Sequence, residues 1–359
     1  MLDLTATTAA NEAELEAFLA RLSARVQAYL SLRQDNPEQT DHLRHVADRT
    51  RWLYVAELQR QTPEQPPPIG RHDDRLIDAC VLGHDIGKWI PREALRQLLP
   101  TRAEDLLPVL RELRLLPNQS ELLLLGIRRR LELTQDGYSP EYDAAHHLVS
   151  AFILVTDPDM HFHKLSLRDQ DRLISAIIGH QFGSYFKERL FQISLHDQAV
   201  TTGMLVDVSR PEQLAGDLLA SAFHDADIAD LLFVGSLEHR PNREDHLHAG
   251  GLVKILLINF MTTIYQVPDA PNTYEDCLRS CQLTINNVCQ EFLTATAVEH
   301  GTKWRREANN FLNRLRGTET AGRFKALLSD QTRAPQERLA SLRLQTHWHA
   351  RSFLAGDSA

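Results

Sequence analysis

The stretch of sequence that decides the fold runs from residue 81 to residue 88 and reads VLGHDIGK. His84 and Asp85 are adjacent, and adjacent side chains on a helix diverge by about 100°. Such a pair cannot face one metal ion squarely, but it can straddle two metal ions with the carboxylate between them. Gly83 and Gly87 remove side chains where the backbone must approach metal and substrate. We therefore take this stretch as the centre of a candidate metal site.

Helical periodicity dominates the sequence around this stretch. Apolar residues recur at three- and four-residue steps between residues 12 and 32, which is typical of one buried helix face. No stretch shows the alternation bounded by turns that is typical of a β-hairpin. The expected fold class is therefore all-α. Further helices are expected over 40–61, 73–88, 141–156, 168–182, 211–233, 245–267, 273–298, 301–316 and 335–354.

The helices are expected to form three segments. An N-terminal helix occupies 1–40, a metal-binding core occupies 41–240, and a helical extension occupies 241–359. Prolines punctuate the region of about 90–140, which we interpret as a helical hairpin inserted into the core. The extension is expected to pack on the core or to form a homodimer interface.

Composition limits the classes of function. The chain has 359 residues, 43% of them hydrophobic and 24% charged, as in a globular protein. Its formal net charge of −9 disfavours a large nucleic-acid footprint, which needs a strongly basic face. The four cysteines form no Cys-x-x-Cys pair, and no signal peptide or membrane-spanning run is evident, so a cytoplasmic location is expected.

Histidine is abundant, with 17 residues spread along the chain. Four segments place a histidine or an aspartate beside small residues: DHLRHVA at 41–47, HHLVSA at 146–151, AIIGHQFG at 176–183 and FHDADIAD at 223–230. Together with the GHDIGK motif, these segments resemble the HD-domain superfamily over roughly residues 40–235. Members of that superfamily are helical metal-dependent phosphohydrolases, with a few oxygenases.

The resemblance implies a ligand set that binds two divalent transition-metal ions, drawn from Mn, Fe, Co, Ni and Zn. His146 is preferred to His147 because only one of two adjacent helical residues can face the metals. His45, one turn after the preferred ligand of its helix, stays an alternative. Asp225 likewise stays an alternative in its segment, where Asp230 is in a place to orient a ligand. The implied ligands are His42, His84, Asp85, His146, His180 and Asp227.

The resemblance also implies an activity. The expected reaction is hydrolysis of a phosphoester or phosphoanhydride in a small, nucleotide-like phosphorylated substrate. Asp85 would bridge the metals and hold the attacking water, and Lys88 would face the phosphate or assist proton transfer. Lys187 and Arg189 are weaker candidates for binding a terminal phosphate, and the arginines at 128–130 are still weaker candidates for lining a lid formed by the insert. A di-iron oxygenase with the same ligands, and a regulatory module that only senses a nucleotide, are the alternatives.

Several other clusters of metal-ligand residue types lack a complete ligand set. The members of two histidine pairs are two residues apart on predicted helices and should diverge. A third pair lies in a loop-like stretch, and the two cysteines on one helix face have no further zinc ligands nearby. We interpret these as packing or surface residues: His161 with His163, His246 with His248, His347 with His349, and Cys277 with Cys281.

Overall fold

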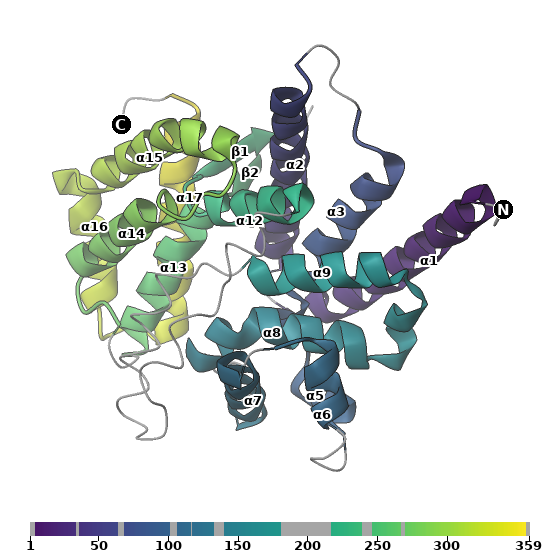
Figure 1. Ribbon diagram of the computed structural model, residues 1–359. Helices are drawn as coiled ribbons and strands as arrows, with labels where there is room; N and C mark the ends of the chain where they lie inside the picture. The colour runs from purple at the N-terminus through teal and green to yellow at the C-terminus, as the bar shows by residue number, and fades with distance from the viewer. Residues whose placement is uncertain are drawn as a thin grey trace. The chain divides into compact units, whose positions relative to one another are not determined.

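The computed structural model describes residues 4–33, 36–63, 68–100, 106–115, 117–132, 140–180, 217–238, 246–266 and 270–356. Within these residues the chain forms fifteen α-helices and one two-stranded sheet (Figure 1). The prediction of an all-α protein is therefore confirmed. The contacts divide the chain into two compact units, which are described separately.

Unit 1 comprises residues 1–36 and 46–226. Its central element is α8, which contacts α4, α7 and α9. Figure 1 shows α8 between α9 and α7. From residue 144 to residue 154 every α8 side chain is buried, as expected for a helix that other helices surround. The helices wholly within unit 1 are α1 (Leu4–Leu30), α3 (Arg71–Gly83), α4 (Ile86–Trp89), α5 (Arg92–Leu98), α6 (Leu106–Glu112), α7 (Pro117–Glu132), α8 (Pro140–Thr156) and α9 (Leu167–Gly179).

The long helix α1 packs on α3 and α4 through the apolar stripe that the sequence predicts. Leu15, Phe18 and Leu22 are fully buried along this stripe, at the three- and four-residue steps of one helix face. Half-buried Arg25 of α1 forms an ion pair with buried Asp157, whose carboxylate accepts the Asp159 amide and so caps the short 3₁₀ helix η2 (Pro158–Met160). A second 3₁₀ helix, η3 (Phe162–Lys164), follows before α9. Burial of the stripe holds α3, and with it the residues that follow α3, in a fixed place.

The expected insert at about 90–140 is helical, but its described part holds three helices, α5, α6 and α7, where a two-helix hairpin was expected. Pro91 lies at the N-cap of α5, and Pro100 follows soon after that helix ends. Because proline favours the first turn of a helix and cannot continue one, these residues divide the region more finely than a hairpin would. Helix α7 packs along α8, so the insert is part of the core of unit 1.

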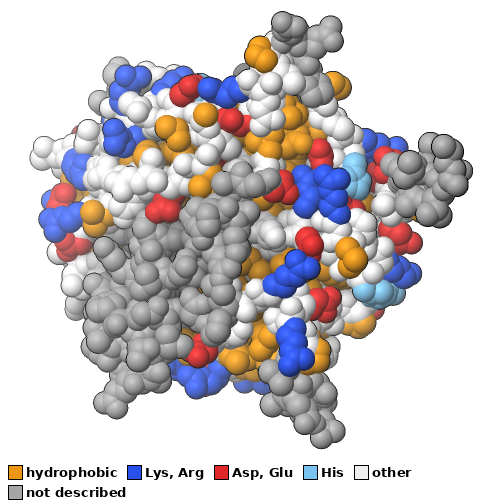
Figure 2. Space-filling model, in the orientation of Figure 1, with side chains coloured by type: hydrophobic (Ala, Val, Ile, Leu, Met, Phe, Trp, Pro, Cys, Tyr) orange, Lys and Arg blue, Asp and Glu red, His pale blue; other side chains and the backbone are white. Residues whose placement is uncertain are grey.

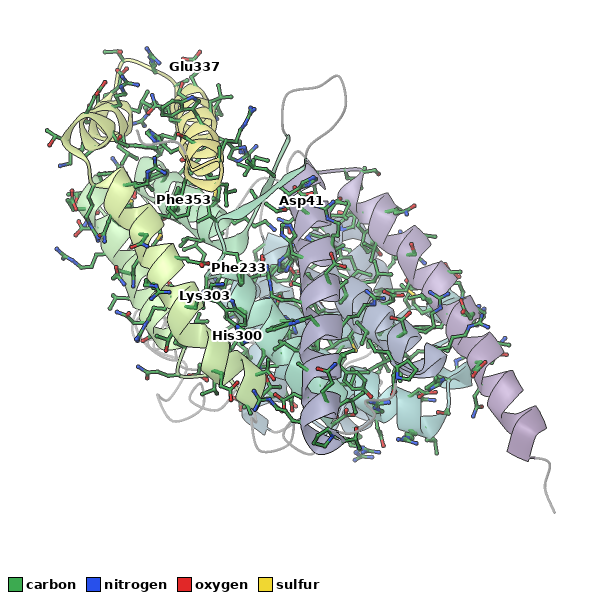
Figure 3. The ribbon with its side chains drawn as sticks, turned by 90° about the horizontal axis from the view of Figure 1, so that it is seen from above. Asp41, Phe233, His300, Lys303, Glu337 and Phe353 are labelled. Carbon is green, nitrogen blue, oxygen red and sulfur yellow. The ribbon has the colours of Figure 1, made fainter. Side chains whose placement is uncertain are left out.

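Unit 2 comprises residues 37–45 and 227–359. Its core lies around α13, which contacts α14, α16 and α17. Phe260, Tyr274 and Phe324 stack there, with ring centroids 5.4–6.0 Å apart. Figure 3 labels Glu337 and Phe353 toward the two ends of α17. The helices wholly within unit 2 are α13 (Gly251–Ile264), α14 (Tyr274–Val288), α15 (Ala295–Leu315), α16 (Thr318–Ser329) and α17 (Pro335–Leu354).

Two helices have residues in both units. Helix α2 (Asn36–Gln61) has residues 37–45 in unit 2 and its remainder in unit 1. Helix α12 (Leu218–Asp230) has residues 227–230 in unit 2 and the preceding part in unit 1. The boundaries expected near residues 40 and 240, between the N-terminal helix, the metal-binding core and the helical extension, stay predictions.

A small antiparallel sheet corrects one part of the sequence analysis. Strands β1 (Gly235–Glu238) and β2 (His246–Ala249) pair in unit 2, so the helix expected from residue 245 begins only at Gly251. Each strand has four residues, which is too short for alternation to be distinguished from chance. A Cβ on Gly250 would collide with the Phe233 carbonyl, so glycine is required where the chain leaves β2 and enters α13.

No helix among the described residues combines the length and the apolar character needed to cross a membrane. On the face of the molecule shown in Figure 2, basic and acidic side chains are intermixed over the described surface.

Candidate metal centre

Four of the six implied ligands meet inside unit 1. His84 caps the C-terminus of α3, and Asp85 follows it directly. His146 comes from α8, and His180 caps the C-terminus of α9. All four side chains are buried. Three helices that are distant in sequence therefore deliver one buried His/Asp cluster.

The ligand atoms of this cluster face one another. Asp85 Oδ1 lies 3.3 Å from His146 Nε2 and 4.0 Å from His180 Nε2. The other carboxylate oxygen of Asp85 lies 3.6 Å from His84 Nε2. The Nε2 atoms of His146 and His180 are 3.1 Å apart. Asp85, His146 and His180 thus each offer a ligand atom within 4.8 Å of the others, which is the spacing a shared metal ion needs.

Backbone carbonyls fix the tautomers of two of these histidines. His84 Nδ1 donates to the Val81 carbonyl at 2.7 Å, and His180 Nδ1 donates to the Ile177 carbonyl at 2.5 Å. A neutral imidazole that donates through Nδ1 keeps a lone pair on Nε2. Metal-binding histidines usually have this arrangement, with the other ring nitrogen held by a carbonyl or a carboxylate. The donor set could therefore hold a metal ion.

Asp85 is held in its ionised form. Burial opposes ionisation, but the electrostatic influence of neighbouring His84 and of the Lys88 ammonium group, together with a hydrogen bond to His146, outweighs it, so the pKa of Asp85 lies well below its ordinary value. Lys88 Nζ is 2.9 Å from Oδ1 and 3.1 Å from Oδ2 of this carboxylate. The expectation that Lys88 shares a helix face with Asp85 agrees with this contact. A charged carboxylate is ready to bind a cation.

The turn that carries these ligands is attached to α8 through Gly87. Its amide donates to Ser150 Oγ at 2.9 Å, and Ser150 Oγ in turn donates to the His84 carbonyl at 2.5 Å. The Tyr142 hydroxyl donates to the Gly87 carbonyl. A Cβ on Gly87 would collide with the His146 carbonyl. The reason for this glycine is thus the close approach of α8, whereas the sequence analysis attributed it to the approach of metal and substrate.

His147 also lies beside the cluster, a placement that the sequence analysis missed. Its ring centroid is 5.7 Å from that of His146 and 6.2 Å from that of His180. It is fully buried, and neither ring nitrogen makes a hydrogen bond of good geometry to a described residue. Burial, together with neighbouring His146 and His180, holds the pKa of His147 well below its ordinary value, although the Ala144 backbone acts in the opposite direction. His147 is therefore a neutral packing residue.

Phe223 of α12 packs against two of the ligands from another side. Its ring centroid lies 5.5 Å from that of His84 and 6.0 Å from that of His180. The side chain is fully buried. An apolar wall of this kind restricts ring rotation and lowers the local dielectric, which strengthens electrostatic interactions with a bound cation.

The other two implied ligands meet inside unit 2. His42 Nε2 lies 3.3 Å from Asp227 Oδ1, and His42 Nδ1 lies 2.9 Å from Asp230 Oδ2. Burial and Lys254 disfavour the protonated imidazole, but Asp227 and Asp230 favour it more, so the pKa of His42 is raised.

The alternative ligands make other contacts. His45 Nδ1 is 3.9 Å from the nearer Asp230 oxygen, which is beyond hydrogen-bond distance. The Asp225 carboxylate accepts a hydrogen bond from His224. The structure thus places His42 with Asp227, and the convergence of all six ligands on one centre stays a prediction.

The remaining candidates are placed as follows. Arg128 and Arg129 pair with Glu132 on the same helix, whereas Arg130 donates to the Ile90 carbonyl at the end of α4. Lys187 and Arg189 lie outside the described residues.

One histidine pair needs correction. His246 and His248 lie on a strand, where residues two apart share a face, and not on a helix where they would diverge. His248 hydrogen-bonds to Asp41 of α2, whose position is labelled in Figure 3.

The fold and the site define an all-helical protein with a buried His/Asp cluster that could hold a metal ion. No protein-family model matches the chain, and the comparisons with curated proteins and with solved structures found no match. The cluster is compatible with an HD domain, and the resemblance itself depends on the sequence motifs.

Proposed function

We propose that this protein is a metal-dependent phosphohydrolase of the HD-domain type. Its substrate would be a phosphoester or phosphoanhydride in a small, nucleotide-like molecule. The observation that supports this most is the cluster around Asp85, where an ionised carboxylate and the Nε2 lone pairs of His84 and His180 face a common point. Imidazole nitrogens and a carboxylate gathered within 4.8 Å of one another are the donor types that a protein uses to hold a divalent metal ion.

The proposed ligands divide between the two clusters. Asp85, His84, His146 and His180 of unit 1, with His42 and Asp227 of unit 2, would hold two divalent transition-metal ions, as the resemblance to the HD-domain superfamily implies. Such metals lower the pKa of water and neutralise charge on phosphoryl oxygens. This donor set of imidazoles and carboxylates suits Mn, Fe, Co, Ni or Zn better than Ca.

The chain's own residues would then orient the reaction. Asp85 would accept a hydrogen bond from the attacking water and keep it directed at phosphorus. Lys88, which is about one-third exposed, would turn from Asp85 toward the phosphate and stabilise charge on the leaving side. Phe223 and the buried α8 would exclude bulk water from this side of the site.

A metal analysis joined to a substrate screen tests the proposal. The chain is first treated with EDTA, then supplied with Mn²⁺, Co²⁺, Ni²⁺ or Mg²⁺ and mixed with a panel of nucleotides and other phosphorylated metabolites. We expect phosphate or nucleotide release that requires the metal and is abolished in Asp85→Asn. Asp169→Asn, which alters a buried carboxylate paired with His72, is the matched control and should keep the activity.

Two results would contradict this proposal. Tight metal binding with substrate turnover only in the presence of O₂ and iron would assign the site to oxidation. Metal-dependent binding of a nucleotide with no turnover of any substrate would assign it to sensing. Circular dichroism of both variants distinguishes loss of chemistry from loss of fold.

A further inference from the structure

We propose that Asp230 is a positioning residue that holds His42 in the tautomer able to bind a metal ion through Nε2. The inference rests on the proposed role of His42 as a ligand. It assigns to Asp230 a specific task, which is to accept the Nδ1 proton of this one histidine.

The geometry within unit 2 carries the proposal. Asp230 is the last residue of α12, and its side chain is fully buried. Its Oδ2 atom lies 2.9 Å from His42 Nδ1, which is a good hydrogen-bond distance. An ionised carboxylate can only accept hydrogen bonds, so Nδ1 must carry the proton. The other ring nitrogen, Nε2, lies 3.3 Å from Asp227 Oδ1, and it is the atom left for a metal ion when Nδ1 keeps its proton on Asp230.

The position of His42 in its helix explains why a carboxylate is needed. His84 and His180 are helix C-caps, and each donates its Nδ1 proton to a carbonyl three residues earlier, near the end of its own helix. Carbonyls in the last turn have no helical partner and are available for this. His42 lies inside α2, where carbonyls accept hydrogen bonds from the helix itself. A fixed tautomer there requires an acceptor from another element, and α12 supplies it.

The contacts of Asp230 also separate His42 from His45. Both histidines are on α2, one turn apart, and both have Nδ1 directed at Asp230. The distance to His45 is 3.9 Å, against 2.9 Å to His42. The carboxylate is therefore a hydrogen-bond partner of His42 and only a nearby charge for His45. This asymmetry provides a physical reason for one of the two histidines to be the ligand.

The experiment compares Asp230→Asn with the wild-type full chain. The amide can turn its NH₂ toward Nδ1 and so favour the wrong tautomer, as well as removing the charge. We expect Mn²⁺ or Co²⁺ affinity at one site, measured by competition with a fluorescent chelator, to fall about 10- to 100-fold. In the metal-free protein, at a pH high enough for the His42 ring to be neutral, ¹⁵N NMR should show the proton on Nδ1 in the wild type and on Nε2 in Asp230→Asn.

Controls separate positioning from a general loss of stability. Asp169→Asn removes a buried carboxylate that lies 2.9 Å from His72 Nε2, and it should leave metal affinity unchanged. Asp230→Glu keeps the charge and should recover part of the affinity, which gives a second measurement if the amide variant folds poorly. Equal metal affinity in Asp230→Asn and wild type, or equal losses in Asp230→Asn and Asp169→Asn, would overturn the proposal.

A fourth variant separates this inference from the proposed function. His42→Ala should lower metal affinity at least as much as Asp230→Asn. If His42→Ala binds metal as tightly as the wild type, His42 is not a ligand and the role of Asp230 falls with it. The phosphohydrolase proposal would then depend on the unit 1 cluster alone and on its own activity test.

Discussion

Lys88 and a metal ion would compete for the same carboxylate. Lys88 Nζ contacts both oxygens of Asp85, at 2.9 and 3.1 Å. A metal bound by Asp85 has to displace this ammonium group from at least one oxygen. The substitution Lys88→Met removes the charge and keeps most of the side-chain length, so it isolates the competition. We expect the variant to bind metal more tightly while its turnover falls.

The magnitude follows from the geometry and the exposure of the pair. Two unit charges about 3 Å apart attract by roughly 5 kcal/mol at an effective dielectric constant of about 20. The Lys88 side chain is 35% exposed, so solvent screening and side-chain entropy reduce the net contribution to about 1–2 kcal/mol. Without metal, Lys88→Met should lower the free energy of unfolding by that amount. Saturating metal should remove most of the loss, which corresponds to binding about 5- to 30-fold tighter.

The assay is urea unfolding in EDTA and in saturating Mn²⁺, combined with metal affinity by chelator competition. Lys88→Arg keeps a cation beside Asp85 and is the control, with metal affinity expected near that of the wild type. Weaker metal binding by Lys88→Met would refute the competition, because it would make Lys88 a support of the metal site. An equal loss of stability with and without metal would also contradict it.

Three further predictions concern the surroundings of the cluster. The pKa of buried His147 lies well below the ordinary 6.5, so neutral His147 costs the folded state nothing above pH 6.5, and stability is lost as the pH falls below 6.5 and the unfolded chain takes up a proton there. In EDTA, His147→Gln should therefore lose less stability between pH 6.5 and 5 than the wild type. Tyr142→Phe removes the buried hydrogen bond to the Gly87 carbonyl and should lower the free energy of unfolding in urea by about 1 kcal/mol. A free energy of unfolding equal to that of the wild type would contradict the role of this hydroxyl. Gly87→Ala should lower the free energy of unfolding by more than roughly 2 kcal/mol because its Cβ meets the backbone of α8. Gly322→Ala, with open space around it in α16, should instead raise the free energy of unfolding by about 0.5–1 kcal/mol. Similar effects of the two substitutions would refute the steric argument.

The sequence was sufficient for the helical fold class and for the cluster in unit 1. The periodicity of α1 and the continuous burial of α8 are local patterns, so they can be detected without knowing which helix packs on which. The GHDIGK motif located His84 and Asp85, and short motifs located His146 and His180. Each of these residues lies in a short sequence motif, so it could be predicted without knowing how the helices pack.

Other features depend on contacts between distant segments and were missed for that reason. Strands β1 and β2 are too short to alternate visibly, and their pairing exists only when both are folded. His147 looked excluded because adjacent residues diverge, yet α8 is surrounded by other helices and buries both histidines. The requirement for Gly87 lies in the path of α8, more than fifty residues later in the chain. No local pattern carries that information.

Ser150 has a consequence for how the site responds to disturbance. One hydroxyl group accepts from the Gly87 amide and donates to the His84 carbonyl, so a single buried oxygen sets the separation between the turn after α3 and the helix that carries His146. Because Ser150 links this turn to α8, a small shift of α8 along its axis would move the imidazoles of His84 and His146 together and preserve their mutual spacing. We therefore expect the site to tolerate mutations in the outer turns of α8 but not the loss of the Ser150 hydroxyl.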